Sequence, residues 1–310
     1  MNKIEFGDCR ETMRKWAVEG VKVQTCVTSP PYFGLRDYGH EGQIGLEQTP
    51  EEYITAMVEV FRCVWDILAD DGTLWLNIGD SYNAYKANTG GTKFAGFRNQ
   101  PEHRPKGYGL EVKSLKNKDL IGIPWMLAFA LRADGWYLRQ DIIWHKPNPM
   151  PESVRDRCTK AHEYIFLLSK SDRYFFDNEA IKQPMSPNST PSRGKRGANM
   201  SANAVLGNPT QLGGGSRGCE NGLVNRRSVW TVATRPYKGA HFATFPTDLI
   251  EPCILAGSRI GDIVLDPFMG SGTTAQVAVE NNRRYLGCEL NPEYEKLQAE
   301  RLKQSRLEFA

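Results

Sequence analysis

A rigid, partly aromatic corner follows an apolar stretch near the start of the 310-residue chain. The run VKVQTCV, residues 21–27, has the β-branched residues typical of a strand and leads into TSPPYFG, residues 28–34. Proline has no backbone N–H for a sheet, so we expect the strand to end there. A fixed backbone carbonyl and the hydroxyl of Ser29 can accept both hydrogens of an exocyclic amine, while Tyr32 stacks on its ring. A proline-rich turn that merely ends a strand would look the same, so the corner alone leaves both interpretations open.

A glycine-containing turn near the C-terminus is the second chemical signal. It lies in DIVLDPFMGSGTTAQVAVE, residues 262–280, between a strand that ends at Asp266 and a helix that begins at Thr273. Glycines let a ligand approach the backbone closely, and open α/β sheets bind ligands at the carboxyl ends of their strands. The next expected strand ends at Glu289, whose carboxylate can accept hydrogen bonds from both hydroxyls of a ribose.

The details of this turn exclude two common nucleotide motifs. No lysine follows the glycines, as a P-loop requires, and the third glycine of a dinucleotide fingerprint is missing. The turn is therefore typical of an adenosine-bearing ligand without a phosphate chain, and S-adenosylmethionine has that character. A purely structural turn from strand to helix is the second interpretation.

Apolar runs that alternate with helical patterns must position these two motifs. The alternation predicts an α/β fold with a mostly parallel sheet. Thr49 and Glu52 have the spacing of a capping box, with Pro50 at the first helical position. We expect strands at residues 21–27, 73–79, 136–146, 262–266 and 284–290, a hairpin at 163–177, and helices at 49–72, 123–135, 246–258, 273–282 and 292–307.

Together, TSPPY and DPFMGSGTT resemble the motifs of amino-group DNA methyltransferases of the β type, in which the catalytic motif precedes the cofactor motif. FGDCRETM, residues 6–13, and HFATFPTDLIEPCI, residues 241–254, resemble further segments of that family, so the resemblance covers nearly the whole chain. It implies a doubly wound, mostly parallel seven-stranded sheet with one reversed strand, a Rossmann-like fold that uses S-adenosylmethionine and carries an inserted target-recognition region.

The resemblance also assigns roles to residues. It implies that Ser29, Pro30, Pro31 and Tyr32 hold the target base after it has left the duplex. The residues that it implies for cofactor binding are Asp8, Thr28, Phe245, Pro246, Asp266, Pro267, Phe268, Gly270, Ser271, Gly272, Thr273 and Glu289.

Two segments, residues 83–118 and 182–228, interrupt the alternation and are rich in Gly, Asn, Ser, Pro, Lys and Arg. Loops this long within a compact domain are usually functional or disordered. We expect a catalytic domain at 1–181 and 229–310, with a basic insertion loop at 83–118 and a target-recognition region at 182–228. Solvated linkers would have the same composition. The DNA-binding residues that we expect are Lys146, Arg155, Arg157, Arg193, Lys195 and Arg196. For the proline-rich stretch that carries the first three, a stabilised structural connection is the other open interpretation.

The expected activity is methyl transfer from S-adenosylmethionine to the N4 amine of cytosine in double-stranded DNA. In the family, SPPY mostly accompanies N4-cytosine and DPPY mostly N6-adenine, so N6-adenine stays the alternative. Three further classes remain open: an RNA or protein methyltransferase, a nucleotide-using enzyme such as a dehydrogenase, and a non-catalytic DNA-binding module. The sequence leaves open whether the chain is a monomer or a homodimer, and whether a cognate restriction endonuclease accompanies it.

Composition limits the class of protein further. The net charge of +3 is too small to indicate a nucleic-acid partner by itself, so local basic segments must do so. Seven scattered cysteines without metal-ligand spacing predict reduced thiols and no metal site. The sequence has no apolar run of about 18 residues, which indicates a soluble, cytoplasmic protein without a membrane partner.

Overall fold

The computed structural model describes residues 2–35, 37, 39–40, 42–83, 112–185, 222–234 and 245–307, the last four by their backbone alone. The chain divides into two compact units, one formed by Met1–Asp177 with Ser228–Ala310, the other by Asn178–Arg227. Within the second unit, β6 (Gln183–Pro184) pairs antiparallel with β7 (Leu223–Val224). Most of the two basic segments, including Arg193, Lys195 and Arg196, lies outside the described residues.

The first unit contains a sheet whose strands follow the order β1-β10-β9-β2-β3-β5-β4-β8. All neighbouring strands are parallel except β5, which is antiparallel to both β3 and β4, so the sheet has one reversed strand, as expected. The strands are β1 (Asn2–Phe6), β2 (Val23–Thr28), β3 (Leu68–Ile78), β4 (Tyr137–His145), β5 (His162–Ser169), β8 (Val229–Thr231), β9 (Ile263–Asp266) and β10 (Arg284–Glu289).

This sheet has eight strands rather than the expected seven. The short strands β1 and β8 lie at its two edges, where pairing with a neighbour rather than a run of apolar residues makes them strands. The prediction of a hairpin at 163–177 is wrong in its second arm, because β5 ends at Ser169 and residues 170–177 form no strand. The backbone N–H groups of Phe175 and Asp177 instead donate to Asp71 and Ala256, at 2.8 and 2.9 Å.

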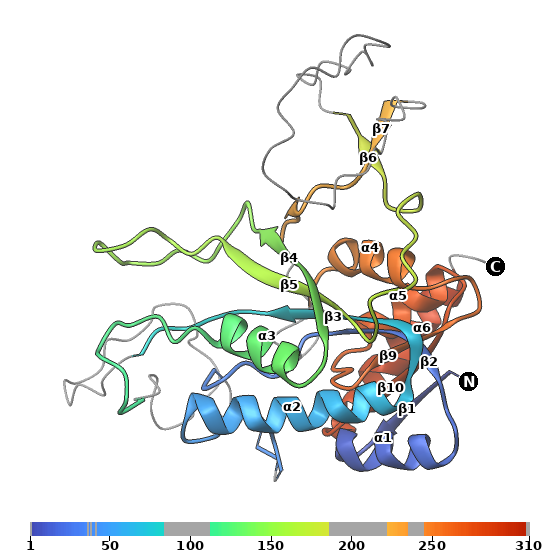
Figure 1. Cartoon of the computed structure of the whole chain (residues 1–310), viewed down its shortest axis with the longest axis horizontal. Helices are drawn as coiled ribbons and strands as arrows, with labels where there is room; N and C mark the ends of the chain where they lie inside the picture. Colours follow the sequence, from blue (N-terminus) through green and yellow to red (C-terminus); the bar gives the residue numbers. More distant parts are fainter. Residues whose placement is uncertain are drawn as a thin grey trace, which may run out of the picture. The chain divides into compact units, whose positions relative to one another are not determined.

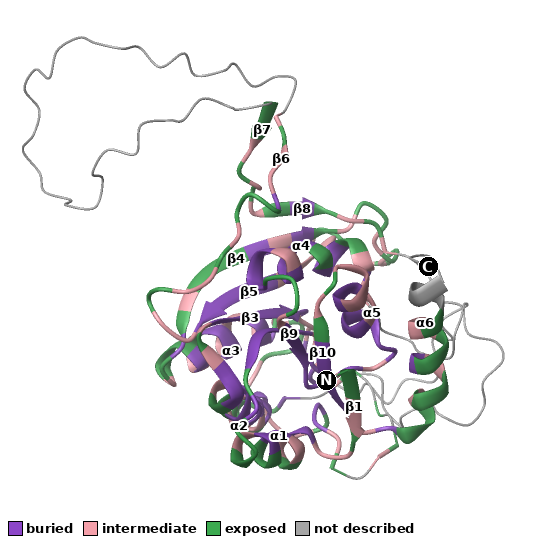
Figure 2. Ribbon diagram, turned by 90° about the vertical axis from the view of Figure 1, so that its right-hand side faces the viewer, coloured by how far each residue is buried: buried purple, intermediate pink, exposed green. Residues whose placement is uncertain are grey.

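Helices cover both faces of the sheet, which is the doubly wound arrangement (Figure 1). Helices α1 (Cys9–Val18), α2 (Pro50–Ile67) and α3 (Ile123–Ala133) pack side by side on one face. Helices α4 (Thr247–Gly257), α5 (Thr273–Glu280) and α6 (Glu295–Leu307) line the opposite face. Figure 2 shows that strands of the sheet centre, such as β3, β5 and β9, are mostly buried, whereas β1 and β4 are largely exposed or intermediate. Among the described helices, none combines the length and apolar composition that a bilayer-spanning segment requires.

Helix α2 begins as its sequence predicts. The Thr49 hydroxyl accepts from the Glu52 N–H at 3.2 Å, and the Glu52 carboxylate accepts from the Thr49 N–H at 3.2 Å. The buried side chains recur at helical spacing and pack into the core beneath β2 and β3: Tyr53, Met57, Val60, Phe61 and Val64. The helix ends at Ile67, five residues before the expected end at 72, because β3 already begins at Leu68.

The parallel direction of β2, β3, β9 and β10 brings their carboxyl ends to one edge of the sheet. These strands end at Thr28, Ile78, Asp266 and Glu289. The proline corner and the glycine turn therefore follow neighbouring strands at the same edge, although they are far apart in the sequence.

Candidate active site

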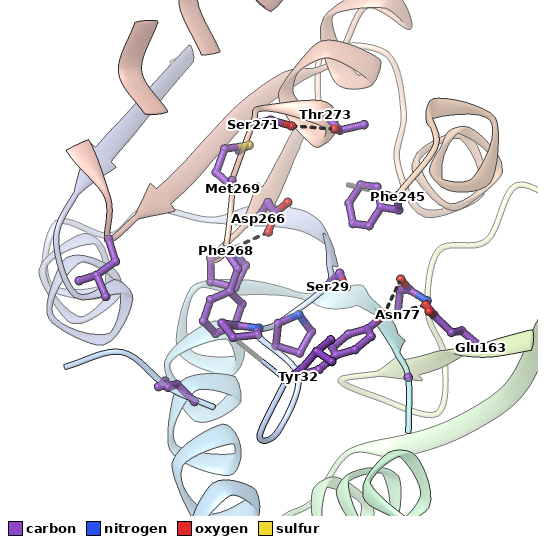
Figure 3. Close-up of a pocket in the computed structure, with 18 of the residues that line it drawn as sticks. Ser29, Tyr32, Asn77, Glu163, Phe245, Asp266, Phe268, Met269, Ser271 and Thr273 are labelled. Carbon is purple, nitrogen blue, oxygen red and sulfur yellow. Dashed lines mark hydrogen bonds between the residues drawn. The ribbon is translucent and has the colours of Figure 1, made fainter. Parts of the chain in front are cut away.

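A cavity of about 960 Å³ lies at this edge of the sheet. Both the proline corner and the glycine turn line it, so Tyr32 and Phe268 face one shared space. In Figure 3, Ser29 lies between the turn that carries Asp266 and Phe268 and the group formed by Tyr32, Asn77 and Glu163. The expected site residues that line the cavity are Asp8, Ser29, Pro30, Pro31, Tyr32, Lys146, Phe245, Asp266, Pro267, Phe268, Gly270, Ser271, Thr273 and Glu289.

Five expected residues of the described part do not line the cavity: Thr28, Pro246, Gly272, Arg155 and Arg157. Pro246 is the N-cap residue of α4, next to the lining residue Phe245. Gly272 is the N-cap of α5 and has φ of +85°, a left-handed conformation that favours glycine. These two residues therefore support the wall of the cavity without forming its surface.

The proline corner is held from below by α2. The Tyr53 hydroxyl donates to the carbonyl oxygen of Pro31 at 2.9 Å, and Tyr53 itself is fully buried. The ring of Phe33 lies 5.6 Å from that of Tyr53 and is also buried, so the chain is anchored on both sides of Tyr32. The Pro31 carbonyl is thus already engaged by a group of the protein itself.

The ring of Tyr32 is fixed at both its edge and its hydroxyl. The hydroxyl donates to Glu163 Oε2 at 2.7 Å, with Asn77 Oδ1 3.4 Å away. A Cβ atom at Gly79 would lie 2.7 Å from Tyr32 Cε2, so only glycine at that position leaves room for the ring. Burial and the negative charge of Glu163 raise the pKa of Tyr32 well above its usual value, so Tyr32 stays a neutral hydrogen-bond donor.

A charged pair completes this side of the cavity. Lys146 forms a short ion pair with Glu163 Oε1, and both side chains are more than four-fifths buried. The Lys146 ammonium also lies 4.2 Å from the centroid of the Trp144 ring, whose N–H donates to the Val232 carbonyl at 2.8 Å. Lys146 is therefore a wall residue whose charge is already paired, and a phosphate would have to compete with Glu163 for it.

Asp266 joins the two motifs through buried hydrogen bonds. Its carboxylate accepts from the hydroxyls of Thr28 and Thr274, each at 2.6 Å, and from the Phe268 N–H at 3.0 Å. These bonds connect the last residue of β2 with the turn after β9 and the first turn of α5. Burial raises the pKa of Asp266 to about 6, although the Thr hydroxyls and the Phe268 N–H favour its charged form.

The glycine turn is held by β10 and α6. The Glu289 carboxylate accepts from the N–H groups of Gly270 and Asn291, at 2.7 and 2.9 Å, and burial raises its pKa. The Gln298 side chain of α6 donates to the Gly270 carbonyl at 2.7 Å. Each carboxylate oxygen can accept a second hydrogen bond, so Glu289 keeps capacity for a ligand hydroxyl while it positions the turn.

Asp8 has two functions in the structure. It caps α1 by accepting from the Arg10 N–H at 2.7 Å, and it forms an ion pair with the Arg10 guanidinium, which lowers the pKa of Asp8. Arg10 is held in turn by Glu59, at 3.2 Å. The carboxylate remains charged at neutral pH, at the part of the cavity wall that it shares with Gly7 and Cys9.

Sequence reasoning missed Asn77, Gly79, Asp80 and Glu163, all of which line the cavity. The first three occur in NIGD at the carboxyl end of β3, and the rule for open α/β sheets would have indicated them. The Asp80 carboxylate accepts from the N–H groups of Gly122 and Ile123 and so caps α3. No local sequence pattern marks Glu163 as a site residue, because its contact with Tyr32 joins positions 131 residues apart.

The expected DNA-binding residues lie in different environments. Arg157 pairs with Glu152 at 2.6 Å and stacks on the Tyr82 ring at 3.9 Å, so it fixes the loop that carries it. Arg155 is exposed in the same loop. Arg193, Lys195 and Arg196 lie outside the described residues.

The fold and the site define a doubly wound α/β protein with a cavity at the carboxyl ends of its parallel strands, and comparison with known proteins identifies the family. Residues 23–301 match the family described as DNA methylase (N6_N4_Mtase). The chain is 48% identical over 308 residues to the Type II methyltransferase M.SmaI of Serratia marcescens, covering 98% of this chain and 91% of that protein. The chain therefore belongs to the N6/N4 DNA methylase family and is a DNA methyltransferase.

Solved structures agree on the fold. The PvuII DNA methyltransferase, described as cytosine-N4-specific, superimposes with a TM-score of 0.62 at 19% identity, covering 97% of this chain and 86% of that one. TTHA0409 of Thermus thermophilus, a putative DNA modification methylase complexed with S-adenosyl-L-methionine, has a TM-score of 0.58 at 22% identity, with 98% and 94% covered. At these identities the likeness shows the shared α/β fold.

Proposed function

We propose that this DNA methyltransferase moves a methyl group from S-adenosylmethionine to the N4 amine of a cytosine that has left the stack of duplex DNA. One observation carries the proposal: the proline corner and the glycine turn line the same cavity of about 960 Å³. That volume lies at the upper end of the range of small-molecule sites, which suits a cofactor and a nucleobase held together.

The glycine-turn side of the cavity fits the cofactor. Gly270 lines this side and has φ of +53°, so no Cβ keeps a ligand away from its backbone. We assign the ribose hydroxyls to Glu289, the adenine to the region of Asp8 and Phe268, and the methionine part to the turn beside Phe245. S-adenosylmethionine, when bound, supplies the electrophilic methyl group.

The proline-corner side fits an amino-bearing base. Since the Pro31 carbonyl is engaged by Tyr53, we assign the Pro30 carbonyl and the Ser29 hydroxyl as acceptors for the two amine hydrogens. These bonds direct the remaining nitrogen lone pair toward the methyl carbon. The cofactor would supply its methyl group to this nitrogen and leave as S-adenosylhomocysteine, and the proton that the amine gives up would pass to solvent. Tyr32 stacks on the base, held by Glu163 and Gly79, so the main contribution of the protein is alignment.

Ser29 favours cytosine over adenine as the target, because a neutral hydroxyl polarises the amine less than a carboxylate would. N6-adenine is the second candidate, since it presents the same amine geometry. Mass spectrometry of nucleosides from DNA incubated with enzyme and cofactor tests the assignment. We expect N4-methylcytosine, and N6-methyladenine as the sole product would contradict it.

Recognition of the DNA belongs to the same proposal. The basic composition of residues 83–118 and 182–228 supports phosphate contacts in both segments, with base reading in the second by residues around Arg193, Lys195 and Arg196. The identity to M.SmaI supports a Type II role beside a cognate restriction endonuclease. Sequencing of modified bases in DNA from cells that express the chain would give the target base and its sequence context together.

RNA and protein substrates, and a purely binding role, have weaker support. Methyl incorporation into DNA, RNA and protein, measured separately, distinguishes the first two from the proposal. A binding role would predict no turnover by the wild type, together with normal DNA affinity of Ser29→Ala and Tyr32→Ala variants.

A further inference from the structure

The loop between β4 and β5, residues 146–161, carries a large apolar side chain to the mouth of the cavity. Met150 lines the cavity, yet 77% of its surface is exposed. Among the large apolar residues that are exposed in the described part of the chain, only Leu35 also lines it. A single exposed methionine needs no explanation, so what sets Met150 apart is its position.

This loop is anchored at its start. The Lys146 N–H donates to the Ala161 carbonyl at 2.8 Å and closes the base of the loop. The Asn148 side chain makes two hydrogen bonds to the backbone of Thr234, each of 3.0 Å. Prolines on both sides of Met150 restrict the backbone further, at positions 147, 149 and 151.

The second arm of the loop is anchored as well. Arg157 pairs with Glu152 at 2.6 Å and stacks on the Tyr82 ring. The Lys160 ammonium donates to the Asp80 carbonyl at 2.9 Å, which ties the end of the loop to the end of β3. The backbone that carries Met150 is therefore already constrained, so placing it against a partner costs little further backbone entropy.

We propose that Met150 enters the base stack of the DNA at the position that the target base leaves, an inference that rests on the proposed function. A flipped base leaves a gap whose neighbours have lost a stacking partner. DNA-binding proteins insert apolar side chains between base steps, methionine among them. The thioether is flexible and makes favourable contacts with aromatic rings, so it can fill the gap whatever the flanking bases are.

Single-turnover methylation tests this inference, with saturating enzyme and duplexes that carry the recognition sequence. Met150→Ala should slow methylation of the fully paired duplex by about tenfold or more, because the flipped state loses its filler. The loss should shrink to about twofold or less on a duplex in which the target base is mismatched, since that base leaves the stack more easily. Met150→Leu should restore most of the rate.

The matched control is Ile260→Ala, which removes a side chain of 75% exposure that does not line the cavity. It should methylate both duplexes like the wild type, and all variants should bind S-adenosylmethionine with wild-type affinity. An unchanged rate of Met150→Ala on the paired duplex, or an equal loss on both duplexes, would overturn the insertion of Met150 into the base stack. Methylation of DNA by the wild type would still uphold the proposed function in that case. A wild type that methylates no DNA would overturn both.

Discussion

The two sides of the cavity are built in different ways. The glycine-turn side, to which we assign the cofactor, is a continuous strand, turn and helix, residues 263–280, braced by Glu289 and Gln298 through hydrogen bonds to its own backbone. The proline-corner side, to which we assign the base, combines the corner after β2, Gly79 after β3 and Glu163 of β5, joined by side-chain contacts. The first side is thus one contiguous segment held at its backbone, whereas the second depends on side chains and close contacts from three separate strands.

This comparison predicts that substitutions on the base side reduce turnover and leave cofactor affinity intact, and that substitutions on the cofactor side do the opposite. Tyr32→Ala should have the largest effect. It removes the stacking ring, and turnover should fall by about 100-fold or more because alignment of the base is lost. Affinity for S-adenosylmethionine, measured by titration, should change by less than about threefold, and a parallel loss of both would refute the separation of the two sides.

Gly79→Ala tests the base side without touching a reacting group. The added Cβ would lie 2.7 Å from the Tyr32 ring, so the ring has to move. We expect turnover to fall by about 10- to 100-fold, since small misplacements of a positioning group are costly in catalysis. Gly79 does not have a positive φ, so this substitution tests the contact with the ring and not backbone strain. Equal activity of Gly79→Ala and the wild type would show that the ring is not held as described.

Glu289→Gln tests the cofactor side. The neutral amide has only one oxygen acceptor group, so it cannot serve both backbone N–H groups and a ribose hydroxyl. Affinity for S-adenosylmethionine should fall by about tenfold, while turnover at saturating cofactor should stay within about threefold of the wild type. A loss of turnover with unchanged affinity for S-adenosylmethionine would contradict the assignment of Glu289 to the cofactor side.

The smallest effect is expected from Asp266→Asn, as a change in how the stability of the chain depends on pH. Because the folded-state pKa is raised to about 6 from 3.8, the folded chain binds more protons than the unfolded chain between these values. The stabilising contribution is complete below pH 3.8 and is lost as the pH rises through about 6. Asparagine does not titrate, so the melting temperature of the wild type should fall relative to Asp266→Asn over this range, by roughly 5 °C. A difference that does not vary with pH would contradict the burial of a charged Asp266.

The two walls also differ in how far the sequence predicts them. The glycine turn was predictable because strand, glycines and helix start are contiguous, and the strand that ends at Glu289 follows at once. Ser29 and Tyr32 were predictable from the proline corner. The partners of Tyr32 were not, because Glu163 and Gly79 meet its ring only after β3 and β5 have paired.

The fold shows the same limit. Long periodic segments such as α2 and the apolar strands of the centre of the sheet were predictable from hydrophobic spacing. The edge strands β1 and β8 were not, because the short sequences NKIEF and VWT become strands through their neighbours β10 and β4. The sequence after β5 resembles a second hairpin arm. In the structure, however, the Phe176 ring stacks on Trp75 of β3, and the Arg259 guanidinium lies over the Phe175 ring. Tertiary contacts decide the structure there.

The most direct test of the shared cavity is a crystal structure of the chain with a non-reactive analogue of S-adenosylmethionine and duplex DNA that contains the target sequence. We predict a cytosine outside the stack, its N4 amine bonded to Ser29 and the Pro30 carbonyl, about 3–3.5 Å from the position of the transferable methyl group. An analogue bound beside Phe268 with the target base still stacked, or held away from Tyr32, would contradict the account.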